Sequence, residues 1–499
     1  MDANTALAEL HQKDREAVRL AQAVAVLEWD QETQLPDRGV EDRAEQLALI
    51  ESLHHQRITD PRIGELLQAA GDANGLGASE AAFVREKQRE YDQQTKLPED
   101  LVARKAEARS LGQATWAAAR KANDFAAFAP RLETLVDLAR ETADLLGYEE
   151  VRYDALLDQF EPYMRASQVT PIFAELRSGL VELLGRIKAR PQVDTEFLGV
   201  DFDVERQEAF SRRILEILNY PTDRGRLDRS AHPFSTKLGS HDVRVTSRYE
   251  ADNVLSSVFS TIHELGHGHY ELGIAPELHG TILDSGTSLA VHESQSRHWE
   301  NMIGRSRQFW QFALPLMQEF FPAQLEGVDV ERMWRAANRV QPSFIRVDAD
   351  EVTYSLHVIL RFELEQALIA GEIQVRDLPE AWRAKSKDLL GVVPETDALG
   401  VLQDVHWSAG LFGYFPTYAL GNLYAAHFLG AMQRDLGDVW AGVAQGKTDH
   451  ILSWLRENIH RHGMAKTAKE LLTDVTGEAL SPRPFLEYLN TKYTAVYGL

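Results

Sequence analysis

Cysteine is absent from this chain of 499 residues. Its absence excludes disulfides, thiolate catalysis and zinc sites with cysteine ligands, and it agrees with a reducing compartment. The first residues are charged and helix-like, without the basic segment and apolar core of a signal peptide. No apolar run approaches the roughly 20 residues that a membrane-spanning helix requires. We therefore expect a cytoplasmic protein that does not enter a membrane.

Positive charge is also scarce. Acidic residues outnumber basic ones by 76 to 53, which gives a net charge of −23. Such a field repels phosphate backbones and anionic lipids, so we expect neither nucleic acid nor membrane surfaces as partners. The composition, 44% hydrophobic and 26% charged, is that of a globular protein. The length allows about three average domains or one large helical domain.

Signals for β-strands, repeats and low-complexity segments are nearly missing, and helical periodicity dominates. Residues 242–249 alternate apolar and polar side chains as a half-buried strand does. Thr170 and Pro171 mark the expected start of one helix. Apolar residues three and four apart predict helices over Ala44–Leu53, Leu101–Ala119, Leu132–Leu146 and Phe173–Ile187, and loops are expected at 69–79, 189–194 and 232–241. The sequence thus predicts a mostly α protein with a small β element near its centre.

The stretch S-T-I-H-E-L-G-H-G-H-Y-E-L near the middle of the chain is rich in histidine. It belongs to a predicted helix that Asn253 or Asp252 caps and whose apolar residues share one face. At about 100° per residue, His263 and His267 are neighbours that point away from that face. His269 falls on the apolar face, so we expect it to be a buried histidine rather than a ligand.

The pattern H-E-x-x-H on a helix is typical of a zinc site that hydrolyses peptides. The neutral imidazoles of His263 and His267 take two metal positions, while Glu264 stays close without ligating and accepts a proton from the attacking water. Zinc, cobalt and manganese all suit such a site. The alternative is a chance match, which need not place both histidines away from the apolar face.

A catalytic zinc ion needs a third protein ligand. The pattern H-E-x-x-H-x-x-G-x-x-H does not apply, because Gly273 stands where its last histidine is required. The other solution is a carboxylate from the next helix-compatible segment, residues 288–300, since turn signals before it allow the chain to fold back. Glu293 is the candidate in this segment. Spacing alone does not separate it from three alternatives, Glu300, Asp284 and His292.

Seven motifs in order along the chain carry a resemblance to a known family. They are W-D-Q-E-T at 29–33, H-P-F at 232–234, D-V-R-V-T at 242–246, H-E-L-G-H at 263–267, H-E-S-Q-S-R at 292–297, I-R-V-D-A-D-E at 345–351 and G-V-L-Q-D-V-H-W at 400–407. On these motifs, and along nearly its whole length, the chain resembles the carboxypeptidase Taq family of zinc metallocarboxypeptidases. One departure is Tyr163 in E-P-Y-M, where the family pattern leads us to expect glycine.

The resemblance implies a single catalytic domain over residues 1–499, mostly α, with two helical halves around a deep groove and the metal at its floor. It implies a carboxypeptidase that acts on peptides with a free C-terminus, and it implies a homodimer. It also favours Glu293 as the third ligand beside His263 and His267, with Zn²⁺ as the cofactor and Co²⁺ or Mn²⁺ as substitutes.

The resemblance extends to groups that act on the reacting carbonyl. It implies that His406, and less directly Tyr418, donate hydrogen bonds to the oxyanion that develops during hydrolysis. The structural alternative for His406 is a hydrogen bond to Asp404, two residues earlier.

A carboxypeptidase also needs a cation for the terminal carboxylate. The resemblance implies that Arg346 is this cation, and a guanidinium group has the required bidentate geometry. An ion pair between Arg346 and Asp348 or Asp350 is the structural alternative. The residues that the resemblance places along or behind the site, with roles that the sequence does not separate, are His232, Asp242 and Arg244.

Two other functions stay open from the sequence. An endo-acting or dipeptide-releasing oligopeptidase shares the metal helix and differs only in how the groove treats the C-terminus. A non-enzymatic helical scaffold with a structural metal would close the fourth coordination position, and it has no use for a base at Glu264. The carboxypeptidase is therefore the function that we expect.

Overall fold

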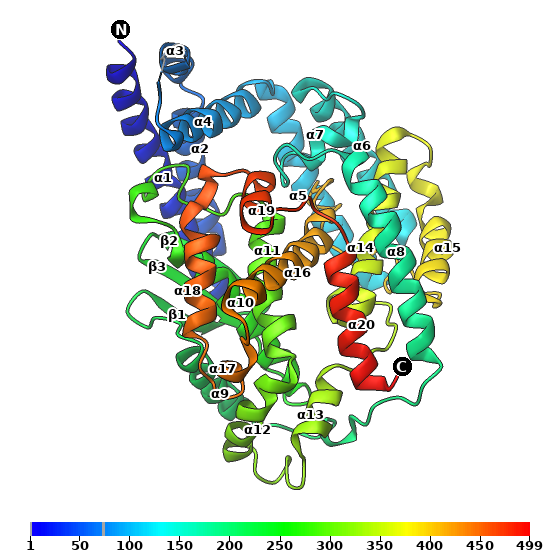
Figure 1. The fold of residues 1–499 in the computed structure, drawn as a ribbon. Coiled ribbons are helices and arrows are strands. Elements are labelled where there is room, and N and C mark those ends of the chain that lie inside the picture. Colours follow the sequence, from blue (N-terminus) through cyan, green and yellow to red (C-terminus); the bar gives the residue numbers. More distant parts are fainter. Residues whose placement is uncertain (1, 72–74) are drawn as a thin grey trace.

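The computed structural model describes residues 2–71 and 75–499, which form a mostly α-helical protein (Figure 1). None of the helices in these ranges combines the length and apolar character needed to cross a membrane. The first half contains α1 (Ala3–Thr33), α2 (Val40–Ile58), α3 (Pro61–Gly71), α4 (Ala78–Thr95), α5 (Glu99–Ala122), α6 (Phe125–Leu146), α7 (Arg152–Leu157), α8 (Ala166–Lys188) and α9 (Val204–Ile217). The second half contains α10 (Val254–Gly273), α11 (Leu289–Arg297), α12 (Arg307–Phe320), α13 (Val330–Ala337), α14 (Glu351–Ala370), α15 (Leu378–Leu390), α16 (Pro416–Leu436), α17 (Trp440–Val443), α18 (Asp449–Asn458), α19 (Ala468–Thr476) and α20 (Arg483–Tyr497).

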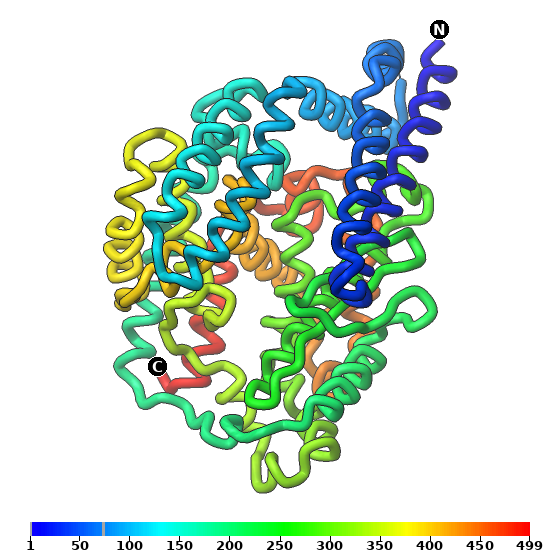
Figure 2. Tube along the Cα trace, turned by 180° about the vertical axis from the view of Figure 1, so that it is seen from behind, coloured from blue at the N-terminus to red at the C-terminus, as the bar shows by residue number. Residues whose placement is uncertain are grey.

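Most of the chain shares one hydrophobic core, which runs from α5 to the C-terminal helix α20 and includes α10, α14 and α16. A second, smaller core joins α1, α3 and α4 to the segment after α10, through side chains such as Leu10, Phe83 and Leu283. In Figure 2 helices α1–α4 lie along one side of the molecule, and α6, α8 and α15 lie along the other. Helices α10 and α11 lie between the two sides (Figure 1), so the histidine-rich helix is central.

A three-stranded sheet packs beside α10, with β3 in the middle, β1 parallel to it and β2 antiparallel to it. Val243 and Val245 of β3 are fully buried, whereas Arg244 between them is partly exposed. The strand predicted at 242–249 is therefore confirmed over Asp242–Ser247, where the two valines face the core and Thr246 and Ser247 after them are buried as well. The strands are β1 (Gly225–Arg229), β2 (Ser235–Gly239) and β3 (Asp242–Ser247).

Two of the three strands were not predicted. The loop expected at 232–241 is wrong in part, because its second half forms β2. β1 and β2 are short and polar, and each buries one leucine, Leu227 or Leu238. They have no apolar alternation, and pairing with β3 is what satisfies their backbone groups. The loop expected at 189–194 is confirmed, and within that expected at 69–79, residues 72–74 lie outside the described residues.

All four predicted helical segments lie within α2, α5, α6 and α8. The predicted start of the last one at Thr170 and Pro171 is wrong, because α8 begins at Ala166. The backbone N–H of Ala166 donates to Oδ1 of the buried Asp154 in α7, at 2.8 Å. This tertiary contact gives a partner to one of the free N–H groups of a helix N-terminus, and so allows the earlier start.

Tyr163 occupies the left-handed backbone region, with φ of 69°. Glycine is favoured there, because a Cβ atom strains this conformation. The Tyr163 hydroxyl donates to Glu86 Oε1 at 3.4 Å, and the Arg89 guanidinium lies 5.5 Å from the ring centre. These contacts offset the strain. The departure from the family pattern therefore affects only this one turn.

Helices α10 and α11 approach each other closely at Gly266, one residue before His267. A Cβ atom here would lie 2.5 Å from the backbone oxygen of Gln295 and 2.6 Å from the Cα of Ser296. Both are backbone atoms, so α11 would have to move as a unit to make room. Glycine at this position therefore sets the distance between α10 and α11.

Gly266→Ala should destabilise the metal-free protein by about 1–3 kcal/mol through overpacking. This reverses the usual effect, since alanine favours a helix interior by about 1 kcal/mol over glycine. Gly185→Ala in α8 is the matched control, because a Cβ there meets no atom within 4 Å. Thermal unfolding followed by circular dichroism measures both variants. A Gly266→Ala protein as stable as Gly185→Ala would contradict the steric argument.

Candidate metal centre

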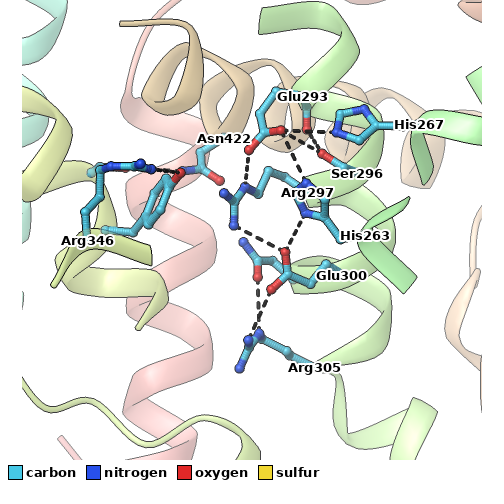
Figure 3. A network of polar contacts seen from close by, with 12 residues as sticks. His263, His267, Glu293, Ser296, Arg297, Glu300, Arg305, Arg346 and Asn422 are labelled. Carbon is cyan, nitrogen blue, oxygen red and sulfur yellow. Dashed lines mark hydrogen bonds and ion pairs between the residues drawn. The ribbon is translucent and has the colours of Figure 1, made fainter. Parts of the chain in front are cut away.

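Two helices bring three possible metal ligands together (Figure 3). His263 and His267 extend from one face of α10, and Glu293 extends from α11. Glu293 Oε2 lies 3.6 Å from Nε2 of His263 and 3.4 Å from Nε2 of His267. Among the described residues, this is the one group of three or more histidine or acidic side chains whose ligand atoms all lie within 4.8 Å of one another.

Local capping sets the start of both helices. The side chain of Asn253 accepts a hydrogen bond from the N–H of Ser256 at 3.3 Å, so Asn253 is the N-cap of α10. Ser288 caps α11 in the same way. His269, two positions beyond the metal-binding pattern, lies on the buried face as predicted, where its Nε2 bonds to the backbone oxygen of Leu218 at 2.9 Å.

In His263 and His267, the hydrogen bond made by Nδ1, the nitrogen that points away from Glu293, determines that Nε2 carries the lone pair. His263 Nδ1 lies 2.9 Å from the carboxylate of Glu300, which can only accept, so this nitrogen donates. His292 Nε2 donates to Glu271 at 2.8 Å, which leaves His292 Nδ1 to accept from Nδ1 of His267 at 2.6 Å. Nε2 of both α10 histidines therefore directs a lone pair toward the carboxylate of α11.

Glu293 completes the set of acceptors as an anion. Burial is the largest single influence and acts to raise its pKa, but the guanidinium of Arg297 together with His263 and His267 holds the pKa of Glu293 well below the usual value. Arg297 Nε donates to Glu293 Oε1 at 2.6 Å, and Ser296 Oγ donates to Oε2 at 3.0 Å. Three acceptor atoms thus converge on one point, and one of them is negatively charged. Such a cluster has the donor chemistry of a zinc site.

The alternatives to Glu293 stand behind the ligands. Glu300 and His292 each bond to the far nitrogen of one α10 histidine, and so orient the ring. Asp284 Oδ1 accepts a hydrogen bond from Lys237 Nζ at 2.5 Å. Lys237 Nζ also lies 3.1 Å from Glu271, so Asp284 stands behind Glu271 and does not reach the cluster. The geometry therefore separates candidates that the spacing left equal.

A cavity of about 980 Å³ opens beside the cluster. Its walls include His263 and Glu293 of the cluster, Glu264 and Arg346, together with Tyr354 and Tyr418. Glu264 is buried, and burial raises its pKa to about 7. A carboxyl group with a proton affinity near neutrality thus lies beside the two histidines of α10.

Arg346 lies in the 3-10 turn η5 (Arg346–Asp348) and is 5% exposed. Its Nε donates to Asp404 Oδ1 at 3.0 Å, and its Nη1 donates to the hydroxyl of Tyr354 at 3.2 Å. The ion pair with Asp348 or Asp350 that the sequence allowed is therefore not the one formed. Asp404 also accepts from the fully buried Arg361 at 2.7 Å. Two guanidinium groups thus share one carboxylate, and the group keeps an excess positive charge.

His406 lies against Tyr418, which lines the same cavity. His406 Nε2 lies 3.1 Å from the Tyr418 hydroxyl, and Nδ1 of His406 has no partner among the described residues. Burial lowers the pKa of His406 to about 3, so the imidazole is neutral. The hydrogen bond from His406 to Asp404, which was its structural alternative, is not formed in this arrangement.

The remaining predicted site residues lie on or next to the sheet. His232 is exposed just before β2. Asp242 and Arg244 of β3 pair with each other at 2.7 Å, and the Arg244 guanidinium lies 4.4 Å from the ring centre of Trp29 in α1. None of the three is among the residues that line the cavity. Their predicted contribution to the site stays a prediction, and β3 lies where it can support α10.

Sequence reasoning missed other groups that shape the site. Arg297 follows Glu293 by one helical turn, a spacing that indicates an ion pair. Tyr354 and Arg361 lie on α14, and no local pattern links them to the histidine helix. Their contacts with Arg346 and Asp404 arise only when α14 packs against η5 and the segment before α16.

Comparisons with known proteins agree with this geometry. Residues 9–493 match the family described as carboxypeptidase Taq (M32) metallopeptidase. The chain is 45% identical to thermostable carboxypeptidase 1 of Thermus thermophilus, over 100% of both chains, and 40% identical to carboxypeptidase 1 of Bacillus subtilis, over 96% of both. It matches the crystal structure of the M32 carboxypeptidase from Deinococcus radiodurans R1 with a TM-score of 0.97 and 40% identity, over 99% of this chain and 100% of that one. The chain therefore belongs to the carboxypeptidase Taq (M32) family and is a metallocarboxypeptidase.

Proposed function

We propose that this metallocarboxypeptidase removes C-terminal amino acids from peptides at a Zn²⁺ ion that His263, His267 and Glu293 hold. The observation that carries the proposal is the convergence of three acceptor atoms, with groups behind them that fix their lone pairs. When bound, the metal polarises the scissile carbonyl and lowers the pKa of water. Co²⁺ and Mn²⁺ suit the same donors and are expected substitutes.

Glu264 is proposed as the general base. It lies beside His263 in sequence and lines the cavity, where it can take a proton from the attacking water and return it to the leaving amine. Its pKa, raised to about 7 by burial, supports both transfers near neutral pH. No second acid is then needed for the reaction.

His406 and Tyr418 are proposed to donate hydrogen bonds to the oxyanion. His406 is neutral and buried, and its contact with the Tyr418 hydroxyl fixes the relative position of the two groups. Donors held in place before the reaction stabilise developing charge without reorganisation, which is the basis of oxyanion stabilisation.

Arg346 is proposed to bind the terminal carboxylate of the substrate. Its group of two guanidinium groups and one carboxylate, Asp404, lacks one negative charge. A free C-terminus supplies that charge, whereas an amidated or internal peptide group does not. This argument favours a carboxypeptidase over an endo-acting or dipeptide-releasing oligopeptidase, and membership in a metallopeptidase family argues against the scaffold.

The proposal also covers the organisation of the protein. A single catalytic domain over residues 1–499 is supported by the continuous core that most helices share. A cytoplasmic location is supported by the absence of cysteine, and a homodimer by the family resemblance.

Replacement of His263, His267 or Glu293 by alanine should lower metal content and abolish activity, because each change removes one of three ligands. His269→Ala is the control, since its side chain faces the core, and this variant should keep stoichiometric metal. Elemental analysis of the purified proteins measures the outcome. Retention of metal in Glu293→Ala, together with its loss in His269→Ala, would overturn the ligand assignment.

Glu264→Gln keeps the size and helix preference of the residue but cannot accept a proton. Metal should stay bound, while kcat falls by roughly 10²–10⁴, the usual worth of a general base. Steady-state rates on a short peptide, with metal content measured on the same sample, test this. A rate within about tenfold of the parent would be too high for the proposed base.

Arg346→Ala should raise KM for free-acid peptides and weaken catalysis, by about 2–5 kcal/mol in transition-state terms if the ion pair is desolvated. The variant should also lose the preference for a free acid over its C-terminal amide. Arg332→Ala is the matched control, because Arg332 is partly exposed on α13 and pairs with Asp194 at 2.7 Å. Mass spectrometry of stepwise shortening reports the products. Internal cleavage of amidated peptides by the parent, at the rate of free acids, would show that the protein is not a carboxypeptidase.

A further inference from the structure

A second cavity, of about 320 Å³, lies between α5, α6 and the segment that follows His406. We call it the α5 cavity. Apolar side chains of α6 and residues 409–412 form much of its wall, while Lys105, Arg109 and Gln159 supply its charged and amide groups. No mechanism described above uses these groups.

The α5 cavity is basic within a strongly acidic protein. Lys105 and Arg109 are one helical turn apart on α5, and no acidic residue is among those that line the cavity. Lys105 is half-buried, burial lowers its pKa, and no charged partner in the described part of the chain opposes this. No carboxylate that lines the cavity balances these two cations, and a buried charge without a partner is costly. A carboxylate ligand would supply the negative charge that Lys105 and Arg109 lack inside the cavity.

The position of Arg109 relative to α1 indicates the direction in which the α5 cavity opens. Burial raises the pKa of Glu28 in α1, and the charge of Arg109 acts in the opposite sense. The two side chains are therefore near enough to interact, so Arg109 lies on the part of α5 that faces α1. Figure 2 shows α5 and α1 on the same face. The α5 cavity thus opens toward the space between the two sides.

A row of aromatic rings connects the α5 cavity to the metal cavity. Phe160 lines the α5 cavity, and its ring centre lies 5.0 Å from that of Tyr414. Tyr414 in turn lies 5.4 Å from Tyr418, which lines the metal cavity. All three rings are half-buried, so each keeps an exposed edge or face. Aromatic surfaces of this kind can contact an extended peptide.

We propose that the α5 cavity is a subsite that binds an acidic side chain of the peptide substrate, on the amino side of the scissile bond. The inference rests on the function proposed above, in which Arg346 holds the terminal carboxylate. A peptide has no residue beyond that carboxylate. Any subsite away from Arg346 is therefore reached only by residues that precede the scissile bond. Lys105 and Arg109 make the subsite selective for glutamate or aspartate at one such position.

The test uses peptides that share one C-terminal residue and carry a single Glu, Gln or Lys at successive positions upstream. At one position, Glu should raise kcat/KM over Gln by roughly three- to tenfold at low salt, and Lys should lower it. The advantage of Glu should shrink as salt is added, because the ion pair is only partly buried. A Glu to Gln ratio near one at every position would overturn the inference.

The Lys105→Met and Arg109→Met double variant should bring the Glu to Gln ratio to one at the selective position. The ratio is taken within each variant, so a general loss of activity or stability cancels. Arg104→Met is the matched control, because Arg104 neighbours Lys105 but is exposed and pairs with Glu141 at 2.7 Å. It should keep the ratio of the parent. A double variant that keeps the parent's ratio would contradict the role of the two cations.

Two further outcomes separate the inference from its alternatives. If the parent shortens peptides from the C-terminus and shows no Glu preference, while inorganic phosphate alters its rate on dipeptides through Lys105 and Arg109, the cavity binds a free anion and the inference is wrong. If the parent does not shorten peptides from the C-terminus, the proposed function fails first. Binding of a Glu peptide and its Gln analogue to Glu264→Gln, measured by fluorescence anisotropy, then decides the inference, because the subsite requires tighter binding of the Glu peptide.

Discussion

Acceptor atoms that converge in a buried place repel one another, and the centre of this protein is arranged around that constraint. His263, His267 and Glu293 direct lone pairs to one point, so each must be held from behind by a hydrogen-bond partner. Glu300 and His292 hold the two rings, and Arg297 holds the carboxylate. The close approach of α10 and α11 allows all of these contacts at once. A bound cation then removes the repulsion that the fold has to sustain without it.

On another wall of the cavity, the groups that are held together against their repulsion are positively charged. Arg346 and Arg361 share the carboxylate of Asp404, and burial makes their excess positive charge costly. Two sites therefore face the cavity. The cluster of His263, His267 and Glu293 can accept a cation, and the separate group around Arg346 can accept an anion. A peptide whose terminal carboxylate meets the second site brings its last peptide bond toward the first. In the proposed function, charge thus orients the substrate before any proton moves.

Much of the fold was predictable because helical periodicity is a local property. Helices α6 and α8 each carry most of their apolar residues on one face, and that face is the buried one. The start of α8 was not predictable, since Asp154 from another helix satisfies its first N–H. β1 and β2 were missed for a similar reason. Their short polar sequences become strands through pairing with β3, which is a contact between separate segments.

The sequence by itself determined that His263 and His267 lie together with Glu264 between them, and that His269 is turned to the core, because residues four apart on a helix are neighbours. Tertiary structure decided that Glu293 faces Nε2 of both histidines, whereas Glu300 faces Nδ1 of His263, because the rotation and distance of α11 relative to α10 depend on Gly266. It also decided that Arg346 pairs with Asp404 and not with the aspartates next to it in sequence. The α5 cavity needs α5, α6 and the segment after His406 in contact, and charges brought together from such distant segments leave no periodic signal in the sequence.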